Sequence, residues 1–268
     1  MAVREVRFAL VGAGFIGRIH GLALQAVNRV FGDTPLKAAA TVLVDTDAAL
    51  AERQAGQLGF ASSGTDWEAV LPQVDAVIIA APSFMHRAIA LGAIAAGKHV
   101  LCEKPVGRST GEAEEVAEAA AKAGITNGVG FTYMRVPLVR HAIDIVKSGK
   151  LGRPVNFRGW HAEDYLADPE APFSWRLDAN LAGRCGALGD LGWHIISIAR
   201  ALCGPIASLS GLAEHVYPTR RTATGAETRR VVETRTGPRR SSASRAAPSA
   251  PSRRAASPMA ARWISASS

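Results

Sequence analysis

The sequence predicts an α/β protein in which a doubly wound parallel sheet is followed by a smaller, incomplete α+β region. Three observations predict this fold. Short apolar runs alternate with amphipathic helical segments through the first half of the chain. A glycine-rich turn joins the first apolar run to the first helical segment. Beyond about residue 132 the alternation becomes sparse, so a second domain with a different architecture is expected to begin there.

The apolar runs are short and bounded by turn residues, as expected for parallel strands that helices cover on both faces. The expected strands are 6–11, 37–44, 76–80, 99–102 and 126–131. Between them we expect a helix that ends near residue 30, a helix over 47–56 capped near Asp45 or Thr46, and helices over 86–96 and 111–123. The second region is expected to contain helices 137–148 and 188–202 and strands 154–161 and 206–216. The predicted domains are therefore 1–132, 133–217 and a tail over 218–268.

The basic character of the chain comes from its last segment. The formal net charge is +8, with 31 basic and 23 acidic residues, and residues 219–268 hold 11 of the arginines but only two acidic residues. The remaining 20 basic and 21 acidic residues balance, which argues against a nucleic-acid-binding face on the folded part. The tail is rich in Arg, Ala, Ser and Pro, so it is expected to be disordered because it cannot bury enough apolar surface. A basic interaction tail is one interpretation, and a frameshift or truncation near Pro218 is the other.

The cysteines and the apolar segments predict a soluble cytoplasmic protein. Three widely spaced cysteines form neither a disulfide framework nor a zinc-binding pattern, and no apolar run is long enough to span a membrane. The apolar start lacks a small-residue cleavage site and continues into the glycine turn, so it is not expected to be a signal peptide.

The glycine turn has the spacing of a dinucleotide-binding motif. Gly12 permits the tight turn, Gly14 lets the backbone approach a pyrophosphate, and Gly17 allows the following helix to pack closely. The second strand ends at Asp45, whose carboxylate accepts hydrogen bonds from ribose hydroxyls and repels a 2′-phosphate. The sequence therefore predicts a Rossmann domain that binds NAD, with NADP less favoured.

Two further motifs carry groups suited to hydride transfer from an alcohol. Glu103-Lys104-Pro105 follows a strand at the carboxyl edge of the sheet, where such folds bind ligands. Asp190 and His194 are four residues apart, so a helix places them on one face, and histidine has a pKa suited to accepting a hydroxyl proton. Two such ligands do not make a zinc site, and no metal is expected.

Taken together, these motifs resemble those of the Gfo/Idh/MocA oxidoreductases (named after glucose–fructose oxidoreductase, inositol dehydrogenase and a rhizopine-catabolism protein). The resemblance also covers the loop 81–86, the segment 130–133 and the segment 186–194. It implies a C-terminal domain built on a large open antiparallel sheet and used for oligomerisation. It also implies reversible hydride transfer between nicotinamide and a sugar or polyol carbinol, including anhydrosugars and cyclitols.

The same resemblance implies roles for individual residues. Lys104 and His194 would be the catalytic pair, with Asp190 positioning the substrate and the histidine. The cofactor would contact Gly12, Gly14, Phe15, Ile16, Gly17, Asp45, Ala81, Pro82, Ser83, His86, Glu103 and Lys104. The substrate would contact Lys104, Tyr133, Trp175, Arg176, Asp190 and His194.

The chain also departs from the family pattern. Thr132 stands where asparagine is common, and Arg184-Cys185 replaces a glycine-rich pair. Family members also continue for a hundred or more residues beyond residue 218, so most of the second sheet is expected to be missing. The alternatives that stay open are a catalytically silent dinucleotide-binding sensor or regulator, a truncated inactive product, and a polyanion binder acting through the tail.

Overall fold

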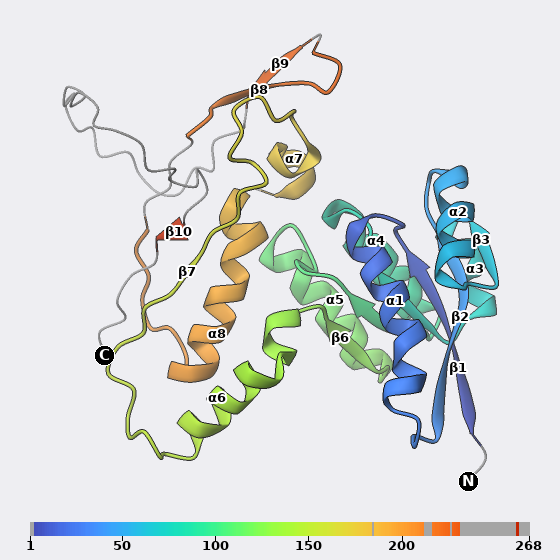
Figure 1. Cartoon of the computed structure of the whole chain (residues 1–268), viewed down its shortest axis with the longest axis horizontal. Coiled ribbons are helices and arrows are strands. Elements are labelled where there is room, and N and C mark those ends of the chain that lie inside the picture. Colours follow the sequence, from blue (N-terminus) through green and yellow to red (C-terminus); the bar gives the residue numbers. More distant parts are fainter. Residues whose placement is uncertain (1–2, 184, 212–215, 226, 231–260, 263–268) are drawn as a thin grey trace. The chain divides into compact units, whose positions relative to one another are not determined.

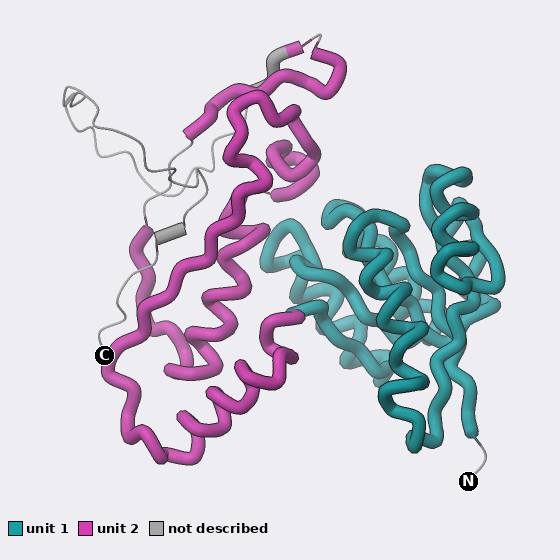
Figure 2. Tube along the Cα trace, in the orientation of Figure 1, with its two compact units in different colours: residues 1–131 teal, residues 132–268 magenta. Residues whose placement is uncertain are grey.

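The chain divides into two compact units, residues 1–131 and 132–268 (Figure 2). The computed structural model describes residues 3–183, 185–211, 216–225, 227–230 and 261–262. The predicted disordered tail lies largely outside the described residues.

The first unit is built on a six-stranded parallel sheet with the order β3-β2-β1-β4-β5-β6 (Figure 1). The strands are β1 (Arg4–Val11), β2 (Leu36–Val44), β3 (Ser62–Gly64), β4 (Ala76–Ile79), β5 (His99–Cys102) and β6 (Asn127–Val129). The strand order reverses direction between β1 and β4. Open α/β sheets bind ligands at such a switch point, outside the carboxyl ends of the strands.

The strands of this sheet are joined by helices, three of which begin at a residue whose side chain caps the helix. The helices are α1 (Phe15–Val30), α2 (Ala48–Leu58), α3 (Trp67–Val70), α4 (Ser83–Ala95) and α5 (Thr110–Ala123). Asp47 caps α2 by accepting a hydrogen bond from the Leu50 N–H, and Ser109 caps α5 by accepting one from the Glu112 N–H. The cap of α2 was therefore placed two residues too early at Asp45, or one residue too early at Thr46.

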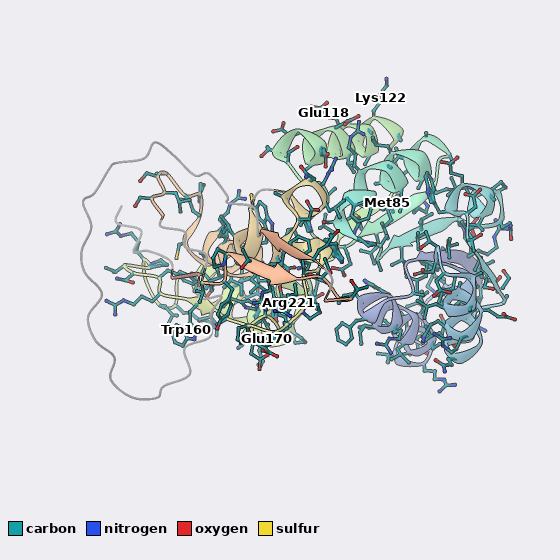
Figure 3. All side chains as sticks on the ribbon, turned by 90° about the horizontal axis from the view of Figure 1, so that it is seen from above. Met85, Glu118, Lys122, Trp160, Glu170 and Arg221 are labelled. Carbon is teal, nitrogen blue, oxygen red and sulfur yellow. The ribbon has the colours of Figure 1, made fainter. Side chains whose placement is uncertain are left out.

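Apolar side chains fill both faces of the sheet because successive residues of a strand point to opposite sides. In β1, Leu10 packs in a cluster with Leu24 of α1 and Leu58 of α2, whereas its neighbour Val11 packs with residues of α4 and α5. The helices are amphipathic in the same sense. In α5, Val116 is buried, whereas Glu118 and Lys122 extend outward from the helix (Figure 3).

The sequence predicted five strands of this sheet correctly and missed strand β3. Strand β3 is only three residues long, and its serines are exposed, so it has no apolar run to reveal it. Helix α4 begins at Ser83, three residues before the predicted start. The predicted doubly wound α/β fold is confirmed.

The burial of the Cys102 thiol allows the packing of the first unit to be tested. Cys102 lies in the core at the end of β5, and burial raises the pKa of its thiol to about 12. Cys185 and Cys203 are exposed. We expect a thiol reagent at mildly alkaline pH to modify Cys185 and Cys203 rapidly and Cys102 only after denaturation, because the thiolate is the reactive form. Rapid modification of Cys102 in the native chain would contradict the packing of the first unit.

The second unit is mainly helical in its described part. Its helices are the 3₁₀ turns η2 (Thr132–Arg135) and η3 (Trp175–Leu177), the π-helical turn η4 (Leu188–Gly192), α6 (Pro137–Lys147), α7 (Ala179–Ala182) and α8 (Trp193–Cys203). Its strands form two short antiparallel pairs, β7 (Trp160–His161) with β10 (Ala261–Arg262), and β8 (Thr219–Arg221) with β9 (Thr228–Arg230).

Of the two strands predicted in this unit, the first was predicted too long and the second was wrong over its described residues. Only Trp160 and His161 of the predicted strand 154–161 pair with another strand. The described residues of the predicted strand 206–216 form no strand, and residues 212–215 lie outside the described residues. Apolar alternation alone does not make a strand where the structure provides no neighbouring edge.

The chain beyond Pro218 contains structure that composition did not predict. In strand β8, Arg220 is 4% exposed and its guanidinium donates hydrogen bonds to the backbone carbonyls of Leu166, Asp168 and Ala171. The guanidinium also lies 4.9 Å from the ring centroid of Tyr217. A buried arginine with several acceptors organises the surrounding loop, so the predicted disorder of 218–268 does not hold for β8 and β9.

Candidate functional site

The glycine turn after β1 leaves no room for side chains at two positions. Gly12 has φ +106°, and a Cβ atom there would lie 2.6 Å from the backbone C and O atoms of Ala80. A Cβ atom at Gly17 would collide with the carbonyl oxygen of Gly12. Neither obstacle is a side chain that can rotate away. The turn therefore brings β1, the start of α1 and the end of β4 into close backbone contact.

Gly14, in contrast, faces open space. No atom lies within 4 Å of the position that a Cβ would take, and Gly14 caps α1 without a side-chain hydrogen bond. Phe15 and Ile16 form the first turn of α1 with exposed side chains. The first N–H groups of a helix have no intrahelical partner and carry its positive dipole end. This arrangement can bind a phosphate group.

Asp45 is tied to the glycine turn. Its Oδ2 accepts a hydrogen bond from the Ala13 N–H at 2.8 Å, and its Oδ1 accepts one from the Asp47 N–H at 3.1 Å. A carboxylate has about four lone-pair sites, so acceptor capacity is left for ribose hydroxyls. Asp45 therefore has two roles open to it, fixing the turn and contacting a ligand.

The loop after β4 is anchored by a buried histidine. His86 is 2% exposed, and its ring nitrogens lie 2.7 Å from the carbonyl oxygens of Ala81 and Pro105. Because a carbonyl oxygen only accepts, each contact is a hydrogen bond when that nitrogen donates. Both nitrogens are thus directed at protein atoms, and Ser83 is also buried. Ala81 and exposed Pro82 are the accessible part of the loop, and the expected cofactor contacts of His86 and Ser83 stay predictions.

Within the Glu103-Lys104-Pro105 motif, the Glu103 side chain fixes the turn through hydrogen bonds. This side chain is nearly buried, and its Oε1 lies 2.9 Å from Nε2 of His20 on α1. Its Oε2 accepts a hydrogen bond from the Lys104 N–H at 3.3 Å. A Cβ at Gly130 would lie 2.5 Å from the same carboxylate. Glu103 therefore links α1 to the Lys104 turn, and its contact with a cofactor stays a prediction.

In the second unit, the carboxylate of Asp190 contacts two side chains, those of Tyr165 and Arg176. Asp190 lies in the π-helical turn η4, and its Oδ2 accepts a hydrogen bond from the Tyr165 hydroxyl at 2.6 Å. The Nε of Arg176 lies 3.5 Å from the same oxygen, and its guanidinium stacks 4.6 Å from the ring centroid of Trp175. Burial and this carboxylate raise the pKa of Tyr165, so its hydroxyl remains a donor.

His194 lies in the first turn of α8 and contacts two other rings. It is 9% exposed, and its ring centroid lies 4.6 Å from that of Tyr133 and 5.3 Å from that of His161. Nε2 of His161 in turn lies 3.3 Å from Oε1 of Glu163. The structure thus brings together the predicted residues Tyr133 and His194. It also brings together Trp175, Arg176 and Asp190.

Three residues of this region were missed by the sequence analysis. They are His161 at the end of strand β7, and Glu163 and Tyr165 in the segment after it, at intervals of two residues. The alternation of polar residues at these positions was the available signal. Their partners Asp190 and His194 are far along the sequence, which is why the pattern was not recognised as part of a site.

Two properties of the described residues bear on the expected class of site. No group of three or more His, Cys, Asp or Glu side chains there is arranged to hold a metal ion. Over the same part of the chain, every helix is too short or too polar to cross a bilayer.

The chain is similar to sugar dehydrogenases along most of its length. Levoglucosan dehydrogenase of Pseudarthrobacter phenanthrenivorans is 35% identical over 220 residues, which cover 81% of this chain and 56% of that protein. A solved levoglucosan dehydrogenase in complex with NADH and L-sorbose superposes with a TM-score of 0.79 at 32% identity, over 85% of this chain and 61% of that one. An oxidoreductase domain protein from Kribbella flavida gives a TM-score of 0.78 at 40% identity, over 86% and 62%.

Two family models divide the chain between them. The NAD-binding Rossmann fold of the oxidoreductase family GFO_IDH_MocA matches residues 6–131, and the GFO/IDH/MocA C-terminal domain matches residues 139–237. The second match continues past Pro218, where the sequence changes in composition. The chain spans about half the length of the curated relatives that it matches. It belongs to the Gfo/Idh/MocA family of oxidoreductases, and its first unit is the NAD-binding Rossmann domain of that family.

Proposed function

We propose that this chain carries the cofactor-binding part, and part of the substrate-binding part, of a nicotinamide-dependent dehydrogenase acting on a sugar or polyol. The observation that carries the proposal is the glycine turn. Gly12 and Gly17 have no room for a side chain, whereas Gly14 faces open space at the start of α1. A turn built this way has its backbone available to a pyrophosphate and fits a dinucleotide.

NAD⁺, when bound, supplies the acceptor for a hydride from the substrate carbinol. We propose that the glycine turn and the first N–H groups of α1 hold its pyrophosphate, and that Asp45 accepts hydrogen bonds from the adenosine ribose. Ala81, Pro82 and the backbone near Lys104 are the proposed contacts on the nicotinamide side. The buried His86 and Glu103 fix the shape of these two loops through the carbonyl and N–H contacts described above.

The chain's own residues would handle the proton and the substrate. Lys104 is proposed to donate a hydrogen bond to the reacting hydroxyl oxygen and to stabilise negative charge there. His194 is proposed to accept the hydroxyl proton as the hydride leaves. Asp190, fixed by Tyr165 and Arg176, is proposed to orient the substrate. Tyr133 and Trp175 complete the proposed sugar contacts with an aromatic ring each.

The proposed substrate is a free sugar or polyol. The similarity of this chain to levoglucosan dehydrogenase supports that proposal. The proposed location is the cytoplasm, in keeping with three cysteines at wide spacing and a diffusible nicotinamide cofactor. Asp45 supports NAD⁺ as the principal cofactor.

The direct experiment incubates the purified chain with NAD⁺ and a panel of sugars and polyols, including levoglucosan and scyllo-inositol, while the absorbance of reduced nicotinamide is recorded. We expect reduction that depends on one class of sugar and is lost in Lys104→Met. NAD⁺ binding is measured in parallel by calorimetry. Binding of NAD⁺ without reduction by any member of the panel would contradict the proposed activity of this chain.

A further inference from the structure

His20 lies in the second turn of α1, the helix whose first N–H groups are proposed to hold the pyrophosphate. Its side chain and that of Glu103 are both largely buried, and His20 Nε2 lies 2.9 Å from Glu103 Oε1. An ionised carboxylate only accepts hydrogen bonds, so this nitrogen carries a proton and donates it. The pair joins residues that are 83 apart in the sequence. It therefore connects α1 to the turn that follows β5.

The surroundings of Glu103 restrict the directions in which its carboxylate can point. Its backbone N–H donates a hydrogen bond of 2.9 Å to the carbonyl of Ile79, at the end of β4. A Cβ at Gly130, directly after β6, would lie 2.5 Å from Oε1, so the carboxylate packs against backbone on that side. The backbone of Glu103 is thus anchored in the sheet, and its side chain reaches from there toward α1.

The two oxygens of Glu103 are bound by donors from different elements. Oε1 receives the hydrogen bond from His20, whereas Oε2 accepts one of 3.3 Å from the Lys104 N–H. The second bond is longer than the usual range for N–H···O, so a small rotation of the carboxylate is enough to break it. The shorter bond from His20 fixes that rotation.

The backbone is held on both sides of Lys104. Glu103 binds the Lys104 N–H, and the carbonyl oxygen of Pro105 lies 2.7 Å from Nδ1 of the buried His86. If the carboxylate of Glu103 turns away, one of these two supports is lost and the Lys104 side chain starts from a different place. A misplacement of about 1 Å in a reacting group costs about 10²-fold in rate.

We propose that His20 is a positioning residue for the dehydrogenase reaction, which through Glu103 fixes the backbone of Lys104 and thereby the place of the Lys104 amine. The inference rests on the proposed function, because it requires Lys104 to act on the substrate hydroxyl. It goes beyond that function by giving a side chain on the glycine-turn helix a role in turnover that needs no contact with cofactor or substrate.

The test compares two replacements of His20 that have nearly the same length. In His20→Gln the amide nitrogen takes the place of Nε2 and still donates, whereas His20→Met has no donor, and both residues are good helix formers. Arg29→Met is the control for methionine in this helix, because Arg29 is exposed in the last turn of α1. Turnover with NAD⁺ and a sugar, the Kd of NAD⁺ by calorimetry and the thermal unfolding temperature are measured for each variant. Hydrogen exchange of the Lys104 N–H, followed by NMR, adds a readout that needs no turnover.

We expect His20→Met to lower kcat by about 10- to 100-fold and to leave the Kd of NAD⁺ within about threefold. Exchange of the Lys104 N–H should become about tenfold faster, because the carboxylate that protects it loses the donor that orients it. His20→Gln should restore kcat and exchange to within about threefold of the unmodified chain. Arg29→Met should match the unmodified chain in every measurement.

Each failure has its own meaning. Unchanged kcat and unchanged Lys104 exchange in His20→Met, with a lower unfolding temperature, give the pair a purely structural role and overturn the proposal. Equal losses in His20→Gln and His20→Met overturn it as well, because the donor is then not what matters. A loss of NAD⁺ affinity as large as the loss of kcat makes His20 part of the cofactor site and also overturns it. If the unmodified chain binds NAD⁺ but reduces none with any sugar, the proposed function is contradicted, and the Lys104 exchange rates alone decide whether His20 holds this backbone.

Discussion

Replacing Gly17 by alanine is expected to abolish NAD⁺ binding and to destabilise the first unit by about 3 kcal/mol, the upper range for overpacking a rigid site. The added methyl group would meet the carbonyl oxygen of Gly12, which is backbone and cannot rotate away. Either the start of α1 must move or the turn must open. Urea denaturation followed by tryptophan fluorescence, together with an NAD⁺ titration at low denaturant, measures both effects.

Two other glycines serve as matched controls for this substitution. Gly14→Ala has ordinary backbone angles (φ −68°) and open space around the new methyl group, so stability should be unchanged. NAD⁺ affinity should nevertheless fall, because the methyl group enters the space proposed for the pyrophosphate. Gly56→Ala, exposed within α2 and unobstructed, should stabilise by up to about 1 kcal/mol and leave binding unchanged. Wild-type stability and binding in Gly17→Ala would contradict the described turn.

Replacing His194 by asparagine is expected to lower turnover about 10²–10⁴-fold, the usual contribution of a general base. The imidazole lies against Tyr133 and His161, and asparagine has no group that accepts a proton at neutral pH. Because His194 belongs to the second unit, NAD⁺ binding by the first unit should be unchanged. Steady-state rates and NAD⁺ calorimetry on the same preparation separate the two effects.

The control for His194→Asn is His141→Asn, an exposed histidine on α6 of the same unit. It should have wild-type turnover. A variant at His194 that keeps full activity, or one that loses NAD⁺ binding together with activity, would show that the imidazole is not the proton acceptor. A pH profile adds a second criterion, since the acid limb that reports protonation of the base should disappear in His194→Asn.

The fold of the first unit was predictable because its strands are continuous apolar runs. The limits of β5 were predicted to the residue, since His99–Cys102 is bounded by a glycine turn before it and a charged pair after it. Strand β3 was not predictable, because Ser62–Gly64 is paired only by its backbone with β2. Its formation depends on a neighbouring edge that the local sequence does not display.

Candidate residues were predictable where chemistry follows from local spacing. The glycine turn and Asp45 are of this kind. The positions of His86 and Glu103 depend on contacts with Pro105, in the loop after β5, and His20, on α1. Sequence reasoning therefore singled out these two residues but could not predict their hydrogen-bond partners.

In the second unit, tertiary contacts decide more of the structure. The Tyr165–Asp190 hydrogen bond joins residues 25 apart, and the carbonyls bound by Arg220 lie 49–54 residues before it. Arg220 lies in a segment whose composition is typical of a solvated tail. It is nevertheless buried, and its guanidinium donates hydrogen bonds to three backbone carbonyls. Composition describes the average environment of a residue type and does not reveal such a specific partner.

The measurement that tests the central claim most directly is a titration of NAD⁺ into the chain, followed by the thermal unfolding of the first unit. If that unit is the dinucleotide-binding domain that its glycine turn indicates, NAD⁺ at about 100 times its Kd should stabilise it by roughly 2.7 kcal/mol. The stabilisation should be absent in Gly17→Ala. No stabilisation of the unmodified chain at any NAD⁺ concentration would contradict the assignment of this chain to nicotinamide-dependent oxidation.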